Sequence, residues 1–114
     1  TRECIIVVEG VFDAIAIDGV GVLGSNINEQ QADIIDSIGK EVIVVPDRDQ
    51  AGEQLIDSAL EYGWGVSFPN WHDDVKDVSD AVLKYGKLFT LSSIIEATQR
   101  NKLKIQLARK KLGN

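Results

Sequence analysis

Short runs of apolar residues alternate with amphipathic stretches along most of this chain. Two of the runs, Cys4–Val8 and Val42–Val45, are continuous and rich in β-branched residues. That pattern is typical of parallel strands with both faces buried. Val20–Leu23 and Trp64–Phe68 are weaker strand candidates. The sequence therefore predicts four short strands.

Three amphipathic stretches lie between these strands, and we predict that they are helices. They cover Val11–Asp18, Glu29–Ile38 and Gln50–Tyr62. Each is followed by a glycine expected to cap it in a left-handed conformation, namely Gly19, Gly39 and Gly63. Alternating strands and helices predict an α/β fold, with a roughly four-stranded parallel sheet flanked by helices through right-handed crossovers.

The C-terminal part is predicted to be mostly helical. A loop over Pro69–Lys76 leads to a short helix near Ser79–Lys84. Ser93 and Glu96 have the spacing of a capping box, which predicts a further helical region running towards Leu112. The chain has 114 residues and 44% hydrophobic content, which suits one domain with a single core. We therefore expect an α/β domain with a C-terminal helical extension.

Acidic residues follow three of the predicted strands where each strand ends. They are Glu9 and Asp13 after the first strand, Asp47 and Asp49 after the third, and Asp73, Asp74, Asp77 and Asp80 after the fourth. The carboxyl ends of strands in an open parallel sheet border one crevice, where ligands bind. We therefore expect these carboxylates to lie along one edge of the sheet.

The carboxylates after the third strand have the spacing of a cation site. Asp47 and Asp49 are alternate residues, so in an extended chain both side chains point the same way. A carboxylate beside a core strand needs a cation or strong hydrogen bonds to stay ionised. Oxygen ligands favour Mg²⁺ or Mn²⁺, and a single histidine with a single cysteine argues against zinc. Gly10 and Gly52 leave room for phosphate or backbone to approach.

Simpler interpretations compete at individual positions. Asp49 precedes a predicted helix and could be only its N-cap. Glu9 is harder to explain in this way, because glutamate is a poor cap. Asp13 could bind metal, orient Glu9 through a water molecule or only favour the start of a helix, and a supporting role is the favoured interpretation. Trp71 and His72 could stack on a base, but a packed aromatic residue and a surface histidine are the favoured interpretation.

Three segments resemble the signatures of the TOPRIM family, in the form seen in bacterial and phage-type (DnaG-like) primases. They are VVEGVFDAIAI at residues 7–17, VVPDRDQAG at 44–52 and KDVSDAV at 76–82. The family pattern is Glu-Gly after the first strand with an Asp soon after, Asp-x-Asp before a helix with a Gly, and a Lys-Asp segment. The resemblance covers residues 4 to 85 and implies a Rossmann-like TOPRIM fold with Mg²⁺-dependent phosphodiester chemistry.

The resemblance also implies a role for individual residues. Glu9, Asp47 and Asp49 correspond to the catalytic acids, and these three with Asp77 would hold Mg²⁺, for which Mn²⁺ can substitute. Supporting positions are Gly10, Asp13, Gly52 and Asp80. Arg48 and Lys76 would contact phosphate or nucleotide.

The primase form of the family implies nucleotidyl transfer in RNA primer synthesis for DNA replication. The implied partners are nucleoside triphosphates, a DNA template with its RNA primer, and a replicative helicase domain in the same chain or another. Residues 1–88 would form the catalytic domain, and residues 89–114 a helical segment that could link to a further domain. Such primases also carry a zinc-binding segment and a basic template-binding subdomain, which these residues lack, so the fragment alone need not synthesise primer.

Three alternatives stay open. TOPRIM domains also occur in topoisomerases, nucleases and recombination proteins. A phosphoacceptor receiver domain has a similar length and Mg²⁺-binding acids, but it needs an acidic pair after the first strand and a lysine after a fifth. A dinucleotide-binding module is suggested by Gly19-x-Gly21-x-x-Gly24, yet these glycines bracket a strand instead of opening a helix.

Charge is distributed unevenly around a net value of −6. Residues 1–99 hold all eighteen acids, whereas residues 100–111 contain six basic residues and no acid. The acidic body argues against a broad nucleic-acid-binding face, because phosphate contacts need basic residues. The basic tail either contacts nucleic acid or a neighbouring domain, or is a solvated helix face. One cysteine and no apolar run of membrane-spanning length favour a cytoplasmic protein, in the host cytoplasm if phage-encoded, with no membrane partner.

Overall fold

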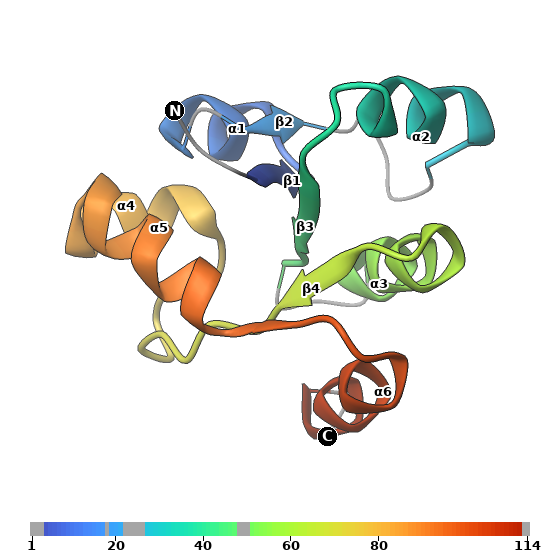
Figure 1. Cartoon of the computed structure of the whole chain (residues 1–114). Helices are drawn as coiled ribbons and strands as arrows, with labels where there is room; N and C mark the ends of the chain where they lie inside the picture. Colours follow the sequence, from blue (N-terminus) through green and yellow to red (C-terminus); the bar gives the residue numbers. More distant parts are fainter. Residues whose placement is uncertain (1–3, 18, 22–26, 48–50, 113–114) are drawn as a thin grey trace.

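The computed structural model describes residues 4–17, 19–21, 27–47 and 51–112, and its core is one five-stranded sheet (Figure 1). The strand order is β2-β1-β3-β4-β5. The strands are β1 (Cys4–Val8), β2 (Val20–Gly21), β3 (Glu41–Val45), β4 (Gly65–Ser67) and β5 (Thr98–Gln99). The first four are parallel, and β5 is antiparallel to β4.

Six helices among the described residues cover the two faces of this sheet (Figure 1). They are α1 (Val11–Ile17), α2 (Glu29–Asp36), α3 (Ala51–Tyr62), α4 (Val78–Tyr85), α5 (Lys87–Glu96) and α6 (Lys102–Leu112). Helices α1, α4 and α5 lie on one side of the sheet, and α2, α3 and α6 lie on the other.

The strand side chains divide between two hydrophobic clusters. Ile5 and Val7 of β1 pack with residues from α2, α3 and α6, whereas Ile6 and Val8 pack with residues from α1, α4 and α5. Successive side chains of a strand point to opposite faces, and here each face is covered by helices. This explains why β1 and residues 42–45 of β3 are continuously apolar instead of alternating with polar residues.

The register between β1 and β3 brings their carboxyl ends together. Cα partners run from Cys4 opposite Glu41 to Val8 opposite Val45. The residues that follow these strands therefore leave the sheet at the same edge. This register places the beginning of the Asp47 segment beside Glu9.

The predicted fold class is confirmed, although some predicted boundaries were too wide. The strand predicted over Trp64–Phe68 contains only Gly65–Ser67, and no sequence pattern indicated β5. Gly39 and Gly63 have positive φ angles of 79° and 77°, as expected for residues that end helices. At Gly19 a β-carbon would lie 2.5 Å from the carbonyl oxygen of Ile6, so its packing against β1 excludes a side chain.

The predicted capping box at Ser93 and Glu96 is wrong. Ser93 lies inside α5, and its hydroxyl donates to the carbonyl oxygen of Thr90, 2.8 Å away. The region to Leu112 consists of two helices separated by β5. The helix break after Glu96 allows Thr98 and Gln99 to pair with β4.

Two residues of the basic tail form ion pairs with the acidic body. The Arg100 guanidinium donates two hydrogen bonds to the carboxylate of Glu41 and holds the pKa of that carboxyl below its usual value. Arg109 of α6 donates to Glu53 Oε2 at 2.7 Å and to Asp57 Oδ1 at 2.5 Å, both on α3. The tail therefore partly neutralises the chain's own acids and fastens α6 to α3.

In the described part of the chain, no helix is both long enough and apolar enough to span a bilayer.

Candidate metal centre

Glu9 connects the acidic residues that follow β1 (the first acidic segment) with those that follow β3 (the second acidic segment); the acidic residues after β4 form the third. Its Oε2 accepts a hydrogen bond from the backbone N–H of Asp47, at a distance of 2.9 Å and a sequence separation of 38 residues. The matched ends of β1 and β3 place these two residues side by side. The Glu9 carboxylate therefore lies at the point where the Asp-x-Asp segment begins.

The second carboxylate oxygen of Glu9 is in an unusual environment. Oε1 is buried and has no hydrogen-bond partner among the described residues. A buried carboxylate oxygen without a partner is unfavourable by roughly 1–3 kcal/mol, and more when the group is charged. Such an oxygen is well suited to bind a cation, so Glu9 fits the expected role.

The Asp47-x-Asp49 segment is only partly described. Asp47 is half-buried and follows β3 through Pro46. Arg48 and Asp49 lie outside the described residues, and Gly52 is in the first turn of α3. The predicted roles of Arg48, Asp49 and Gly52 therefore stay predictions.

Asp13 connects the first acidic segment to the third. Only 5% of its surface is exposed, and its Oδ1 accepts a hydrogen bond of 2.8 Å from the backbone N–H of Ser79 in α4. A β-carbon at Gly10 would lie 3.1 Å from Asp13 Oδ2, so glycine leaves the carboxylate room. Burial raises the pKa of Asp13, and the nearby Asp77 and Asp80 raise it further, against the lowering effect of the Ser79 hydrogen bond.

Asp77, the predicted third-segment ligand, is the N-cap of α4. Its Oδ1 accepts hydrogen bonds from Asp80 N at 2.8 Å and from Ser79 Oγ at 2.9 Å. Asp80 in turn accepts from the backbone N–H of Lys76 at 3.2 Å, and Lys76 itself is exposed. These hydrogen bonds fix the start of α4 beside Asp13.

The described residues thus bring the predicted acids together in two groups. Glu9 lies with the backbone of Asp47, and Asp13 lies near Asp77 and Asp80. Within the described ranges, which omit Asp49, no three His, Cys, Asp or Glu side chains form a group that could hold a metal ion. Ser79 could not be identified from the sequence as the partner of Asp13, because a contact over 66 residues leaves no local signal.

The stability contribution of Asp13 is expected to depend on pH. Its folded-state pKa is raised above the ordinary value of 3.8, so the folded state holds this proton more tightly than the unfolded state. The resulting stabilisation is complete below that ordinary value and is lost as the pH rises through the folded-state pKa. Asp13→Asn should therefore gain stability relative to wild type between pH 3 and pH 7, as measured by denaturant unfolding with a chelator present.

Asp13→Ala is the matched comparison, because it also removes the charge but leaves the Ser79 N–H without its acceptor. It should be about 1–3 kcal/mol less stable than Asp13→Asn. A stability difference between wild type and Asp13→Asn that does not change with pH would contradict the raised pKa.

The chain is similar in structure to several primases. A primase domain from Pseudomonas aeruginosa has a TM-score of 0.68 and 23% identity over 86% of this chain and 34% of that one. The primase of Aquifex aeolicus, with its zinc-binding and RNA polymerase domains, has a TM-score of 0.68 and 25% identity over 97% and 30%. A DnaG primase catalytic domain bound to single-stranded DNA has a TM-score of 0.62 and 23% identity over 84% and 34%.

The chain spans about a third of the length of these primase chains. No curated protein matches it. The family described as Toprim-like matches residues 6–82, which include Glu9, Asp13, Asp47 and Asp77. The matched range runs from β1 into α4 and contains all three acidic segments. Its length and position show that the chain belongs to the Toprim-like family.

Proposed function

We propose that this chain is the metal-dependent catalytic domain of a DNA primase, which joins ribonucleotides into an RNA primer for DNA replication. The main support for the proposal is the position of Glu9. One of its carboxylate oxygens binds the backbone of Asp47, and the other is buried without a partner. The likeness to primase domains supports the primase branch of the family.

The metal in this proposal is Mg²⁺, with Mn²⁺ as a substitute. Toprim domains typically bind divalent metals, and the unpartnered Glu9 Oε1 fits such a ligand. Glu9, Asp47 and Asp49 would hold the ion, with Asp77 as a further ligand. When bound, Mg²⁺ stabilises charge on the reacting phosphate oxygens and lowers the pKa of the attacking hydroxyl.

The protein's own groups would orient the reactants. Glu9 is held by the Asp47 N–H through Oε2, so its Oε1 stays available to hold the ion. Lys76 is exposed at the start of the third acidic segment, where its ammonium can contact a nucleotide phosphate. Arg48 has the same proposed role.

The proposed partners are nucleoside triphosphates, a single-stranded DNA template with its RNA primer, and a replicative helicase domain in the same or another chain. One structurally similar primase domain binds single-stranded DNA. Residues 1–88 would be the catalytic domain and residues 89–114 a helical segment leading to a further domain. The proposed location is the cytoplasm.

Strand extension on a DNA template tests this function. The protein with its natural flanking sequence is given labelled ribonucleoside triphosphates, Mg²⁺ and a single-stranded template. We expect template-dependent RNA that requires Mg²⁺ and falls by at least about a hundredfold in Glu9→Gln, since a catalytic carboxylate contributes on that scale. Glu61→Gln, an exposed residue near the end of α3, should retain wild-type synthesis.

The same assay separates the alternatives. Cleaved DNA without new RNA would overturn the primase proposal in favour of a nuclease, recombination protein or topoisomerase. The receiver-type alternative has lost its support, because the chain is Toprim-like and β5 is an antiparallel strand of Thr98 and Gln99. The dinucleotide-binding alternative rested partly on Gly24, which lies outside the described residues.

A further inference from the structure

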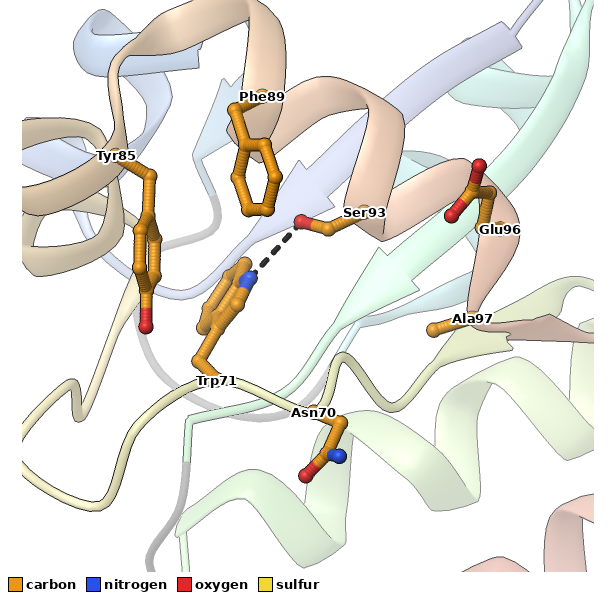
Figure 2. A pocket seen from close by; sticks show the side chains of 7 residues that line it. All are labelled: Asn70, Trp71, Tyr85, Phe89, Ser93, Glu96 and Ala97. Atoms are coloured by element: carbon orange, nitrogen blue, oxygen red, sulfur yellow. Dashed lines mark hydrogen bonds between the residues drawn. The ribbon is translucent and has the colours of Figure 1, made fainter.

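A pocket between α5 and the loop after β4 has no role in the proposed metal chemistry (Figure 2). Its volume is about 330 Å³, which lies at the lower end of the range for small-molecule sites. Residues that line it include Asn70, Trp71, Tyr85, Phe89, Ser93 and Glu96. Three of these are aromatic, and they come from the loop after β4, α4 and α5.

The floor of the pocket is held by hydrogen bonds. Trp71 is 8% exposed, and its Nε1–H donates to Ser93 Oγ at 2.9 Å, as Figure 2 shows. A packed Trp71 was the favoured interpretation of the sequence, and the structure confirms it. The Tyr85 hydroxyl accepts a 3.0 Å hydrogen bond from the backbone N–H of His72. A preformed floor of this kind loses little conformational entropy when a ligand binds.

Phe89 forms an exposed aromatic wall beside this floor. Its ring centroid is 5.2 Å from that of Tyr85, and 58% of its surface is exposed. Gly86 joins α4 to α5 with φ 87° and ψ 161°, a conformation that is essentially restricted to glycine. The turn at Gly86 therefore brings Tyr85 and Phe89, which are four positions apart, together at the pocket.

The polar groups of the pocket select the kind of ligand. The Glu96 carboxylate and the Asn70 amide lie on the right and at the bottom of Figure 2, and none of the described residues that line the pocket is basic. Phosphate is therefore disfavoured, because an anion would meet Glu96 without a compensating cation. A flat, neutral ring with an amino group fits better, since aromatic side chains stack on bases and carboxylates accept hydrogen bonds from their amino groups.

The pocket also lies at the end of the sheet where the proposed metal centre is found. Trp71 belongs to the same hydrophobic cluster as Val8 and Val45, the last residues of β1 and β3. The backbone N–H of Phe68 donates to the carbonyl oxygen of Ala97 at 3.1 Å, which ties the end of α5 to the end of β4. The pocket and Glu9 therefore lie at the same end of the sheet.

We propose that this pocket binds one unpaired nucleobase that carries an exocyclic amino group, stacked against Phe89 with its amino group directed to Glu96. This inference rests on the proposed function, because that function is the reason to expect that the base belongs to a nucleic-acid strand. Phe89 and Glu96 would form a binding site for one base, separate from the proposed metal centre.

The test follows the Trp71 indole N–H signal by NMR during titration with single nucleosides, in a chelator and without divalent metal. Trp64→Phe assigns this signal, because the chain has two tryptophans. We expect saturable shifts with adenosine, cytidine or guanosine and much smaller shifts with uridine, which lacks an amino group. Phe89→Ala should weaken binding about tenfold, which is within the usual range for losing a stacking partner.

Phe12→Ala is the matched control, because Phe12 is 81% exposed on α1 and does not line the pocket. It should bind nucleosides like wild type, whereas Glu96→Gln should reduce the preference over uridine. No saturable shift with any nucleoside, or equal binding of uridine, would overturn the proposal. Shifts with arginine amide alone would also overturn it and indicate a basic protein segment as the occupant. The nucleoside titration contains no divalent metal. A failure to bind nucleosides is therefore a separate result from a failure to synthesise RNA in the strand-extension test.

Discussion

Combining Glu9→Gln with Asp47→Asn is expected to weaken Mn²⁺ binding by at least about a hundredfold, or roughly 2.7 kcal/mol. The variant removes two of the proposed anionic ligands and keeps the shape of both side chains. The hydrogen bond between residues 9 and 47 should survive in the variant. Its donor is the backbone N–H of residue 47, and the amide oxygen of the introduced glutamine can still accept. Loss of binding would therefore report the missing charges and not a local collapse.

Calorimetric titration of Mn²⁺ into the folded chain measures this effect, with thermal unfolding as the check on folding. The matched control is Asp33→Asn with Glu61→Gln, two exposed acids on α2 and α3 whose replacement changes the net charge equally. The control should bind Mn²⁺ like wild type. Unchanged affinity in the variant at Glu9 and Asp47 would show that the metal site lies elsewhere.

Ile94→Ala is expected to lower the free energy of unfolding by about 2–5 kcal/mol, the usual range for a large-to-small change in a core. Ile94 is fully buried on α5 and belongs to the cluster that contains Ile6 and Ile43 of the central strands. This effect tests the proposed division of the chain into a catalytic domain (residues 1–88) and a helical segment (residues 89–114), because Ile94 lies in the second part. A large loss would mean that α5 is part of the core of the catalytic domain.

Ile95→Ala is the control on the same helix, since Ile95 is 43% exposed and lies next in the sequence. Ile95→Ala should lower the free energy of unfolding by less than about 1 kcal/mol. Denaturant unfolding of both variants gives the comparison. If Ile94→Ala cost no more than Ile95→Ala, the helical segment would be dispensable for the core, as a simple linker would be.

Strands β1 and β3 could be predicted because each is a run of buried apolar residues in the centre of the sheet. Strand β5 contains two residues, too few for any periodic pattern, and it pairs with β4. Strand β2 is equally short and was only a weak candidate within Val20–Leu23, and it pairs with β1. Ser93 shows a second limit. Its spacing from Glu96 suggested a helix start, but its hydroxyl accepts from Trp71, a partner 22 residues away.

The candidate site was predictable to a similar extent. The approach of Glu9 to the start of the Asp47 segment followed from the rule that parallel strands end at one edge. The contact between Asp13 and Ser79 did not follow, because it depends on how α1 and α4 pack. The pocket at Phe89 was also missed, since it depends on the turn at Gly86 and on the position of α5.

The hydrogen bond between the Asp47 N–H and Glu9 affects the kinetics and affinity of any ion that arrives. A free glutamate side chain loses up to about 2 kcal/mol of rotamer entropy when it is immobilised. In this chain much of that ordering takes place during folding, so a cation would meet a carboxylate that is already aimed. Rapid exchange of ions with little rearrangement of the protein is the behaviour that such an arrangement favours at the proposed metal centre.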